Sequence, residues 1–250
     1  MSSSSQLPKL YEEFAAWWPL LSAPEDYEEE AEFFYTLLIK SGCNPGARLL
    51  ELGSGGGNNA FYIKRHFEMT LVDLSHGMLE VSKGLNPECE HIHGDMREIR
   101  LGREFDAVFI HDAVMYLTTV EDLERVIDTA YIHCELGGLA LFVPDCVKET
   151  FRPAIKRGGH NGKNRSMRYL EWTWDPDPED STYLCDFVYL LHDEASEIRC
   201  EADRHEFGLF SRGTWLEILT KVGFQTHSIP FNHSEEEDTY EVFLGLKSNK

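Results

Sequence analysis

Short apolar runs alternate along much of the chain with longer segments whose apolar positions recur every three or four residues. The runs Leu49–Leu52, Met69–Leu74, Cys89–His93, Phe105–Ile110 and Leu139–Val143 predict five strands, and the segments between them predict helices. The Phe105–Ile110 run is almost continuously apolar, which is typical of a parallel strand buried on both faces. Regular alternation of strand and helix predicts an α/β fold with a parallel sheet.

Capping and turn residues predict where some helices begin and end. The Ser75 side chain can accept a backbone hydrogen bond, so it is placed to cap a helix that contains Met78. A helix is predicted over Thr118–Glu135, with Gly137-Gly138 as its stop.

Two segments depart from the alternation. Residues 7–41 predict two helices rich in aromatic side chains, of which the first spans Leu7–Leu21 and is disrupted near its end by Pro19. Residues 147–210 contain a basic, glycine-rich loop at Arg157–Arg165 and then three strand-like runs separated by turns. We therefore expect a helical lid near the N-terminus and an antiparallel β insert that caps the site.

The alternation resumes after the insert. A helix is predicted over Ser211–Val222, followed by strands at Phe224–Pro230 and Tyr240–Leu246 that only a turn separates. A length of 250 residues fits one domain with an insertion. The sequence thus predicts a single domain over residues 1–250 that includes the lid and the insert.

Charge and composition narrow the choice of partners. Acidic residues outnumber basic ones by 44 to 23, giving a formal net charge of −21. This field repels nucleic acid and anionic membranes, so we expect neither as a partner. The acidity favours solubility as its explanation, with attraction of a cationic amine as the alternative.

The remaining composition bears on compartment and assembly. Six scattered cysteines without a C-x-x-C pair, no signal peptide and no membrane-spanning apolar run predict a cytoplasmic protein. No complete set of metal ligands is spaced along the chain. No motif distinguishes a monomer from a homodimer.

A run of glycines follows the strand at Leu49–Leu52 and precedes a helical segment: Gly53-Ser54-Gly55-Gly56-Gly57. A strand, glycine turn and helix in this order present free backbone N–H groups to a ligand. The run fits two registers, a dinucleotide fingerprint that ends at Ala60, or Gly53-x-Gly55-x-Gly57 with Glu51 before it.

An acidic residue ends the next strand. Asp73 stands about 18 residues after Gly55, where a nucleoside-binding sheet places a carboxylate for the ribose hydroxyls. An ionised carboxylate only accepts hydrogen bonds, which suits a pair of hydroxyl donors. We expect this side chain to be exposed and to contribute little to packing.

Four motifs occur in order over roughly residues 45 to 145: ELGSGGG, VDLSHGML, HGDMREI and FDAVFIHDAVMYL. In sequence and spacing this series resembles class I methyltransferases that depend on S-adenosylmethionine (SAM). The resemblance implies a Rossmann-like sheet of seven strands with an antiparallel last strand. It also implies SAM as the cofactor and S-adenosylhomocysteine as its product.

The same resemblance implies roles for single residues. The residue at Asp95 accepts from the adenine amino group, Leu74 and Met96 flank the ring, and Met78 lies beside it. The residue at His111 lies near the methionine end. The full set of expected cofactor-binding residues is Tyr11, Trp18, Glu51, Gly53, Ser54, Gly55, Gly57, Asp73, Leu74, Met78, Asp95, Met96 and His111.

Two further stretches narrow the resemblance. YEEFAAWW and DYEEEAEFF are similar to an N-terminal segment that closes over the cofactor in small-molecule methyltransferases, although Trp18-Pro19 replaces the usual Tyr-Asp. DRHEFGLFSRGTWLEILTKVGF, at Asp203–Phe224, resembles a stretch of the amino-sugar N,N-dimethyltransferases. This resemblance implies a small-molecule acceptor with an amine nitrogen.

Methyl transfer to a neutral amine depends mostly on orientation, whereas an alcohol or an ammonium also needs a general base. Tyr11, His111 and His205 are the candidate catalytic residues, and His111 has the alternative role of holding SAM. The sequence therefore predicts SAM-dependent methylation of a small-molecule amine. The alternatives are O- or carboxyl methylation and SAM binding without catalysis.

Overall fold

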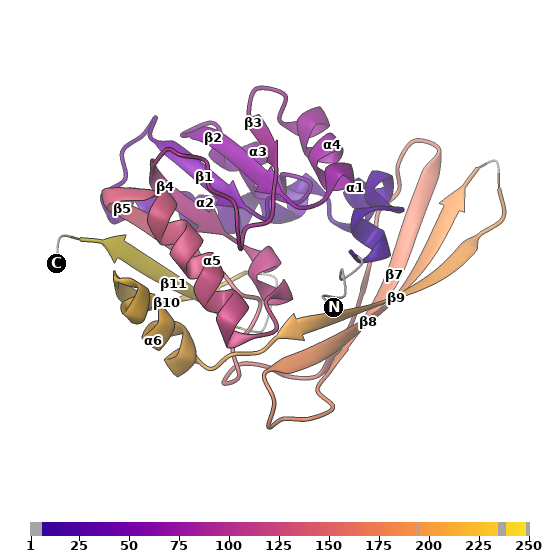
Figure 1. The fold of residues 1–250 in the computed structure, drawn as a ribbon. Coiled ribbons are helices and arrows are strands. Elements are labelled where there is room, and N and C mark those ends of the chain that lie inside the picture. Colours follow the sequence, from indigo (N-terminus) through magenta and orange to yellow (C-terminus); the bar gives the residue numbers. More distant parts are fainter. Residues whose placement is uncertain (1–6, 195, 235–238, 249–250) are drawn as a thin grey trace.

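A computed structural model describes residues 7–194, 196–234 and 239–248 of the chain (Figure 1). None of the helices within these ranges has the length and apolar character needed to cross a membrane. The helical elements are η1 (Lys9–Tyr11), η2 (Ala15–Trp17), α1 (Trp18–Leu21), η3 (Pro24–Tyr27), α2 (Glu28–Lys40), α3 (Asn58–Ile63), α4 (His76–Leu85), η4 (Asp112–Tyr116), α5 (Val120–His133) and α6 (Arg212–Val222).

The strands form two sheets. They are β1 (Arg48–Leu52), β2 (Glu68–Asp73), β3 (Glu90–His93), β4 (Phe105–Ile110), β5 (Cys134–Phe142), β6 (Ala154–Gly158), β7 (Arg165–Trp174), β8 (Thr182–Asp193), β9 (Arg199–Gly208), β10 (Phe224–Asn232) and β11 (Thr239–Lys247).

The larger sheet has the strand order β10-β11-β5-β4-β1-β2-β3. Strands β1 to β5 pair in parallel, and β11 pairs antiparallel with both β5 and β10. The seven-stranded, Rossmann-like sheet predicted from the sequence is confirmed. Its order reverses between β1 and β4, and in such sheets ligands bind at the carboxyl ends of the strands beside this reversal.

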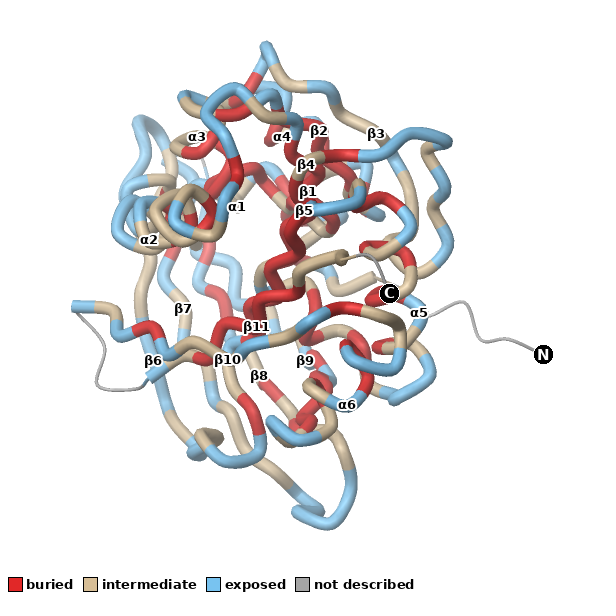
Figure 2. The backbone as a smooth tube through the Cα atoms, turned by 90° about the vertical axis from the view of Figure 1, so that its left-hand side faces the viewer, coloured by how far each residue is buried: buried red, intermediate tan, exposed pale blue. Residues whose placement is uncertain are grey.

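Helices cover both faces of this sheet, which explains the continuous apolar strands (Figures 1 and 2). Leu49 of β1 packs with α2 and α3, whereas its neighbour Leu50 packs with α5 and α6 on the opposite face. All four residues from Leu49 to Leu52 are buried. Packing on both faces therefore fixes the strand whose end carries the glycine turn.

The N-terminal segment is not the single helix predicted over Leu7–Leu21. It forms two 3₁₀ turns and the one-turn helix α1, because the backbone leaves helical geometry at Glu12 (φ −117°, ψ −80°). Pro19 lies in the first turn of α1, where a missing N–H costs nothing, so it begins that helix and does not end one. The aromatic side chains are thereby held by tertiary contacts.

The boundary between α5 and β5 also differs from the prediction. The helix ends at His133 and β5 begins at once with Cys134, so Gly137-Gly138 lies inside the strand. The β4–β5 register shifts between Phe105 and Ala107, opposite this stretch. Glycine is common where a strand is irregular, so the two glycines allow this shift in register. They do not stop the helix.

The insert forms a separate antiparallel sheet in the order β6-β7-β8-β9. The predicted loop at Arg157–Arg165 was partly wrong, because β6 supplies a fourth strand that pairs with β7. One face of this sheet packs against the N-terminal segment through Leu10, Phe14 and Tyr189. Trp172 lies on the other side of β7 and is 49% exposed, so it neither fills a core nor lines the site.

Candidate functional site

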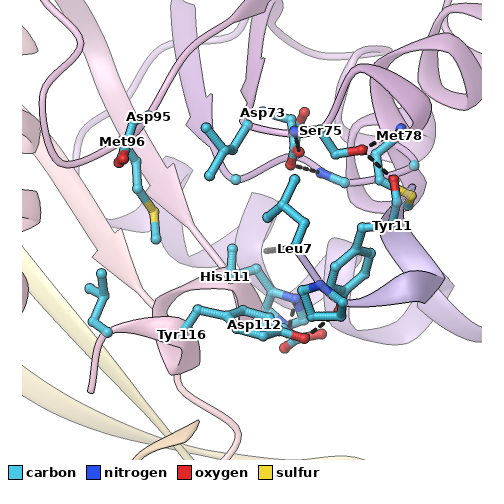
Figure 3. A pocket seen from close by; sticks show the side chains of 18 of the residues that line it. Leu7, Tyr11, Asp73, Ser75, Met78, Asp95, Met96, His111, Asp112 and Tyr116 are labelled. Carbon is cyan, nitrogen blue, oxygen red and sulfur yellow. Dashed lines mark hydrogen bonds and ion pairs between the residues drawn. The ribbon is translucent and has the colours of Figure 1, made fainter. Parts of the chain in front are cut away.

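A cavity of about 570 Å³ opens where β1, β2 and β4 end, between the large sheet and the insert (Figure 3). All but one of the residues predicted to form the site line it: Tyr11, Trp18, Glu51, Gly53, Ser54, Gly55, Asp73, Leu74, Met78, Asp95, Met96, His111 and His205. Gly57 is not among the lining residues. The fold thus brings together positions spread over almost 200 residues of sequence.

The glycine turn forms one wall of the cavity. Gly57 adopts φ 79° as the N-cap of α3, a left-handed conformation that favours glycine, and its carbonyl accepts from the Asn86 amide at 2.9 Å. A Cβ on Gly56 would lie 2.3 Å from Nε1 of Trp18. Gly57 therefore shapes the turn, whereas Gly56 allows Trp18 to pack directly on it.

Asp73 connects the glycine turn to the end of β2. Its carboxylate accepts from the backbone N–H of Gly55 at 2.7 Å and from that of Ser75 at 2.8 Å. Burial raises the pKa of Asp73, and these backbone hydrogen bonds oppose that rise. The expectation of an exposed, structurally idle carboxylate was wrong, although each oxygen keeps a lone pair for a ribose hydroxyl.

Several buried polar atoms on the cavity wall have no hydrogen-bond partner among the described residues. Glu51 is 3% exposed, its Oε2 is unpaired, and burial raises its pKa to about 8. Buried polar groups are normally satisfied, so an unpaired group in a cavity indicates a polar ligand. The unpaired atoms on this wall are Trp18 Nε1, Glu51 Oε2, Ser54 Oγ and Asn59 Oδ1.

The opposite side of the cavity carries Asp95 and Met96 (Figure 3). Arg97 donates to both Asp95 oxygens, with Nη2 at 2.6 Å from Oδ2, and its Nη1 donates to Asp122 at 3.1 Å. Burial would raise the pKa of Asp95, but the hydrogen bonds and charge of Arg97 lower it. Asp95 is therefore an ionised acceptor held in one orientation beside an apolar side chain.

His111 lies beneath the cavity between two carboxylates. Its Nδ1 is 3.0 Å from Asp112 Oδ1 and its Nε2 is 3.6 Å from Glu30 Oε2. Burial alone would lower the pKa of His111, but Asp112 and Glu30 raise it to about 10. The ring is thus a cation at neutral pH, and a cationic imidazole cannot accept a further proton.

Tyr116 is a cavity residue that the sequence analysis did not single out. Its hydroxyl donates to the Tyr11 hydroxyl at 2.8 Å and lies 2.7 Å from Nδ1 of His205. It stands in the HDAVMYL stretch, five residues after the predicted catalytic position His111, so the motif contained it. The short 3₁₀ helix η4 directs the Tyr116 side chain into the cavity, and no periodic pattern in the sequence predicted this helix.

Comparison with known proteins shows which proteins this chain is similar to. Residues 49–138 match the family model described as a methyltransferase domain. The chain is 32% identical to a dTDP-3-amino-3,4,6-trideoxy-α-D-glucopyranose N,N-dimethyltransferase of Streptomyces venezuelae, over 82% of this chain and 86% of the relative. It is 24% identical to a dTDP-3-amino-3,6-dideoxy-α-D-glucopyranose N,N-dimethyltransferase of Streptomyces fradiae, over 82% and 80%.

The fold has solved counterparts as well. A sugar N-methyltransferase from Streptoalloteichus sp. superimposes with a TM-score of 0.83 at 19% identity, covering 100% of this chain and 97% of that one. Three observations agree: the sheet has the order of nucleoside-binding folds, the cavity wall carries polar atoms without hydrogen-bond partners, and the motif series is that of methyltransferases. Together they define an enzyme that uses SAM. The chain belongs to the class I SAM-dependent methyltransferases.

Proposed function

We propose that this enzyme methylates an amine nitrogen of a small molecule, with amino sugars as the first class of acceptor. The named acceptors of the relatives from Streptomyces venezuelae and Streptomyces fradiae are amino sugars, and both relatives are N,N-dimethyltransferases. The resemblance of Asp203–Phe224 to that group supports the same acceptor class. The insert and the N-terminal segment enclose the cavity, which suits a small acceptor.

The charge of the cavity is the observation that carries this proposal. Its lining cations are all paired with carboxylates: Arg97 with Asp95 and Asp122, Arg204 with Asp186, and His111 with Asp112 and Glu30. A cleft lined mainly by one sign of charge concentrates ligands of the opposite sign, here a cationic amine. The lining carboxyl groups are those of Glu51, Asp73, Asp95, Asp112, Asp122 and Glu206.

The unpaired wall of the cavity fits the polar end of SAM, which supplies a methyl group on a cationic sulfur. We assign Glu51 to the ammonium of its methionine part, because a buried carboxyl without a partner suits a cationic donor. Asp73 accepts from the ribose hydroxyls, and Asp95 accepts from the adenine amino group. Trp18, Leu74, Met78 and Met96 supply the apolar surface around these contacts.

The N-terminal segment, residues 7–41, acts as a lid and residues 147–210 act as a cap in this proposal. The Ser75 hydroxyl donates to the carbonyl of Tyr11, and a Cβ on Gly77 would lie 2.7 Å from that of Ala15, so the segment sits tightly on α4. Its other side packs on the insert. Tyr11 is thereby held over the cavity by contacts of its segment with α4 on one side and with the insert on the other.

His111 serves this site as a fixed cation and not as the base. Asn59 donates to Glu30 at 2.9 Å and thereby holds the carboxylate that His111 faces. Tyr11 and His205 both line the cavity and remain the candidates for the proton chemistry of the reaction.

An acceptor panel tests the proposal. The enzyme and SAM are incubated separately with dTDP-3-amino-3,6-dideoxy-α-D-glucopyranose, glucosamine and glucose, and products are identified by mass spectrometry. We expect one or two methyl groups on an amino sugar and none on glucose. Methylation of glucose, or of neither amino sugar, would contradict an amine acceptor.

A further inference from the structure

The Tyr11 hydroxyl is the cavity end of a continuous chain of hydrogen bonds. It lies 2.8 Å from the Tyr116 hydroxyl, which lies 2.7 Å from Nδ1 of His205. Nε2 of His205 in turn lies 3.3 Å from Oδ2 of Asp203. The chain joins the lid, η4 and β9, which meet only because the insert folds back over the large sheet.

Within this chain of hydrogen bonds the His205 side chain is buried from bulk water, while Tyr116 is half-buried and lines the cavity. The His205 side chain is 1% exposed and that of Asp203 is 11% exposed, so contact with solvent increases toward the Asp203 end. The ring of Phe187 lies 4.9 Å from that of His205, and the ring of Phe207 lies 4.9 Å from that of Tyr116. These rings limit the contact of His205 with bulk water.

Titratable groups from several elements surround His205. It faces Asp203 on its own strand, Cys185 opposite on β8, Tyr116 from η4 and Tyr11 from the lid. Burial would raise the pKa of Asp203, but the hydrogen bonds from His205 and from the backbone N–H of Leu10 lower it, so this carboxylate stays ionised. Burial raises the pKa of both tyrosines well above the usual value, so they pass a proton on without remaining ionised.

We propose that Tyr11, Tyr116, His205 and Asp203 form a relay that removes a proton from the acceptor ammonium. In the structure the Tyr116 hydroxyl donates to Tyr11. In the relay both hydroxyl hydrogens are rotated, so that Tyr11 donates to Tyr116, Tyr116 donates to Nδ1 of His205, and Nε2–H of that ring faces Asp203. The ammonium N–H bond breaks and its proton joins the Tyr11 oxygen, while the Tyr11 proton moves to Tyr116 and the Tyr116 proton to His205. The nitrogen keeps the electron pair, and the ring becomes an imidazolium beside Asp203.

This inference rests on the proposed function, because only an amine acceptor arrives as an ammonium. An acidic cavity attracts the protonated form, whereas only the neutral nitrogen has the lone pair that attacks the methyl group. A relay resolves this conflict within the site. Tyr11 touches the acceptor, so it is the catalytic residue, and Tyr116, His205 and Asp203 act through it as positioning residues.

The pH dependence of kcat/KM separates a relay from a structural role. We compare Tyr116→Phe and Asp203→Asn with the wild type, using the amino sugar that the panel identifies. Without the relay, only the neutral amine already present in solution reacts, so kcat/KM should fall by about 100-fold at pH 7. The loss should shrink about tenfold per pH unit as the pH approaches the pKa of the amine.

Tyr189→Phe is the matched control. Tyr189 is a fully buried tyrosine on the inner face of the insert, and its hydroxyl has no hydrogen-bond partner among the described residues. This variant should keep the wild-type pH profile, and all three variants should bind SAM with wild-type affinity. That affinity shows that each has folded.

Two outcomes separate the relay from the function on which it rests. If the wild type methylates an amino sugar and the relay variants lose the same factor at every pH, the relay is refuted and the proposed function stands. If the wild type methylates no amine at all, the proposed function fails, and the relay fails with it.

Discussion

Glu51 offers the sharpest link between the structure and a measurement. Its carboxyl is 3% exposed, and Oε2 has no partner among the described residues. Burial raises its pKa from 4.5 to about 8. In the unfolded chain the same group ionises near pH 4.5, so folding becomes less favourable as the pH rises from about 4.5 to 8 and changes no further above that.

The size of the effect follows from this difference in pKa. The raised pKa lowers the unfolding free energy by about 3 kcal/mol at pH 7 and by about 1 kcal/mol at pH 5. This is the cost of keeping the buried carboxyl protonated when it would ionise in the unfolded chain. Glu51→Gln has nearly the same shape and does not ionise. The variant without ligand should therefore gain about 2 kcal/mol relative to the wild type between pH 5 and pH 7.

Urea unfolding without SAM at pH 5, 6, 7 and 8 measures this difference directly. Glu68→Gln is the control, because Glu68 is exposed at the end of β2 that lies away from the cavity. This variant should show the same pH dependence of unfolding as the wild type. The same Glu51→Gln variant should bind SAM about 10- to 100-fold more weakly, because it loses a charged hydrogen bond to the ammonium. If the unfolding free energies of Glu51→Gln and the wild type differ by the same amount at every pH, and the SAM affinity is unchanged, the assignment of Glu51 is refuted.

Three other substitutions test the site. Asp73→Ala should abolish SAM binding in a calorimetric titration and also lower the unfolding free energy by about 1–3 kcal/mol, since two backbone N–H groups lose their acceptor; unchanged affinity would show that the ribose lies elsewhere. Gly56→Ala should displace Trp18 and weaken SAM binding about tenfold, whereas Gly84→Ala, with nothing within 4 Å of its Cβ, should not. His111→Gln should cost about 5 kcal/mol of unfolding free energy below about pH 6.5, and this difference should vanish as the pH rises through 10, the pKa of the folded ring; a difference independent of pH would mean that the ring is neutral.

Local patterns predicted the large sheet because its strands are specified locally. A run such as Phe105–Ile110 can only be buried on both faces, and the glycine turn follows β1 directly in sequence. A ligand site at the carboxyl ends of the strands could be predicted from the order of the parallel strands. The lining position Asp73 was found because it ends a strand, whereas Asp95, two residues after the end of β3, was found through the resemblance of its motif.

Features that depend on contacts distant in sequence were not predictable in the same way. The N-terminal aromatics suggested a helix, yet Phe14 is held by Tyr189 of the insert and not by helical periodicity. The partnership of Tyr116 with His205 joins residues 89 positions apart. The cationic state of His111 likewise depends on Glu30, whose place beside it only the packing of α2 establishes.

One measurement tests the central claim most directly: a reaction of the enzyme with SAM labelled with ¹³C at its methyl group, with an amino sugar as acceptor. The NMR chemical shift of the transferred carbon distinguishes a methyl on nitrogen from one on oxygen. We predict that the label appears on the amine nitrogen. Label on a hydroxyl or carboxyl oxygen, or SAM binding without any transfer, would contradict the account.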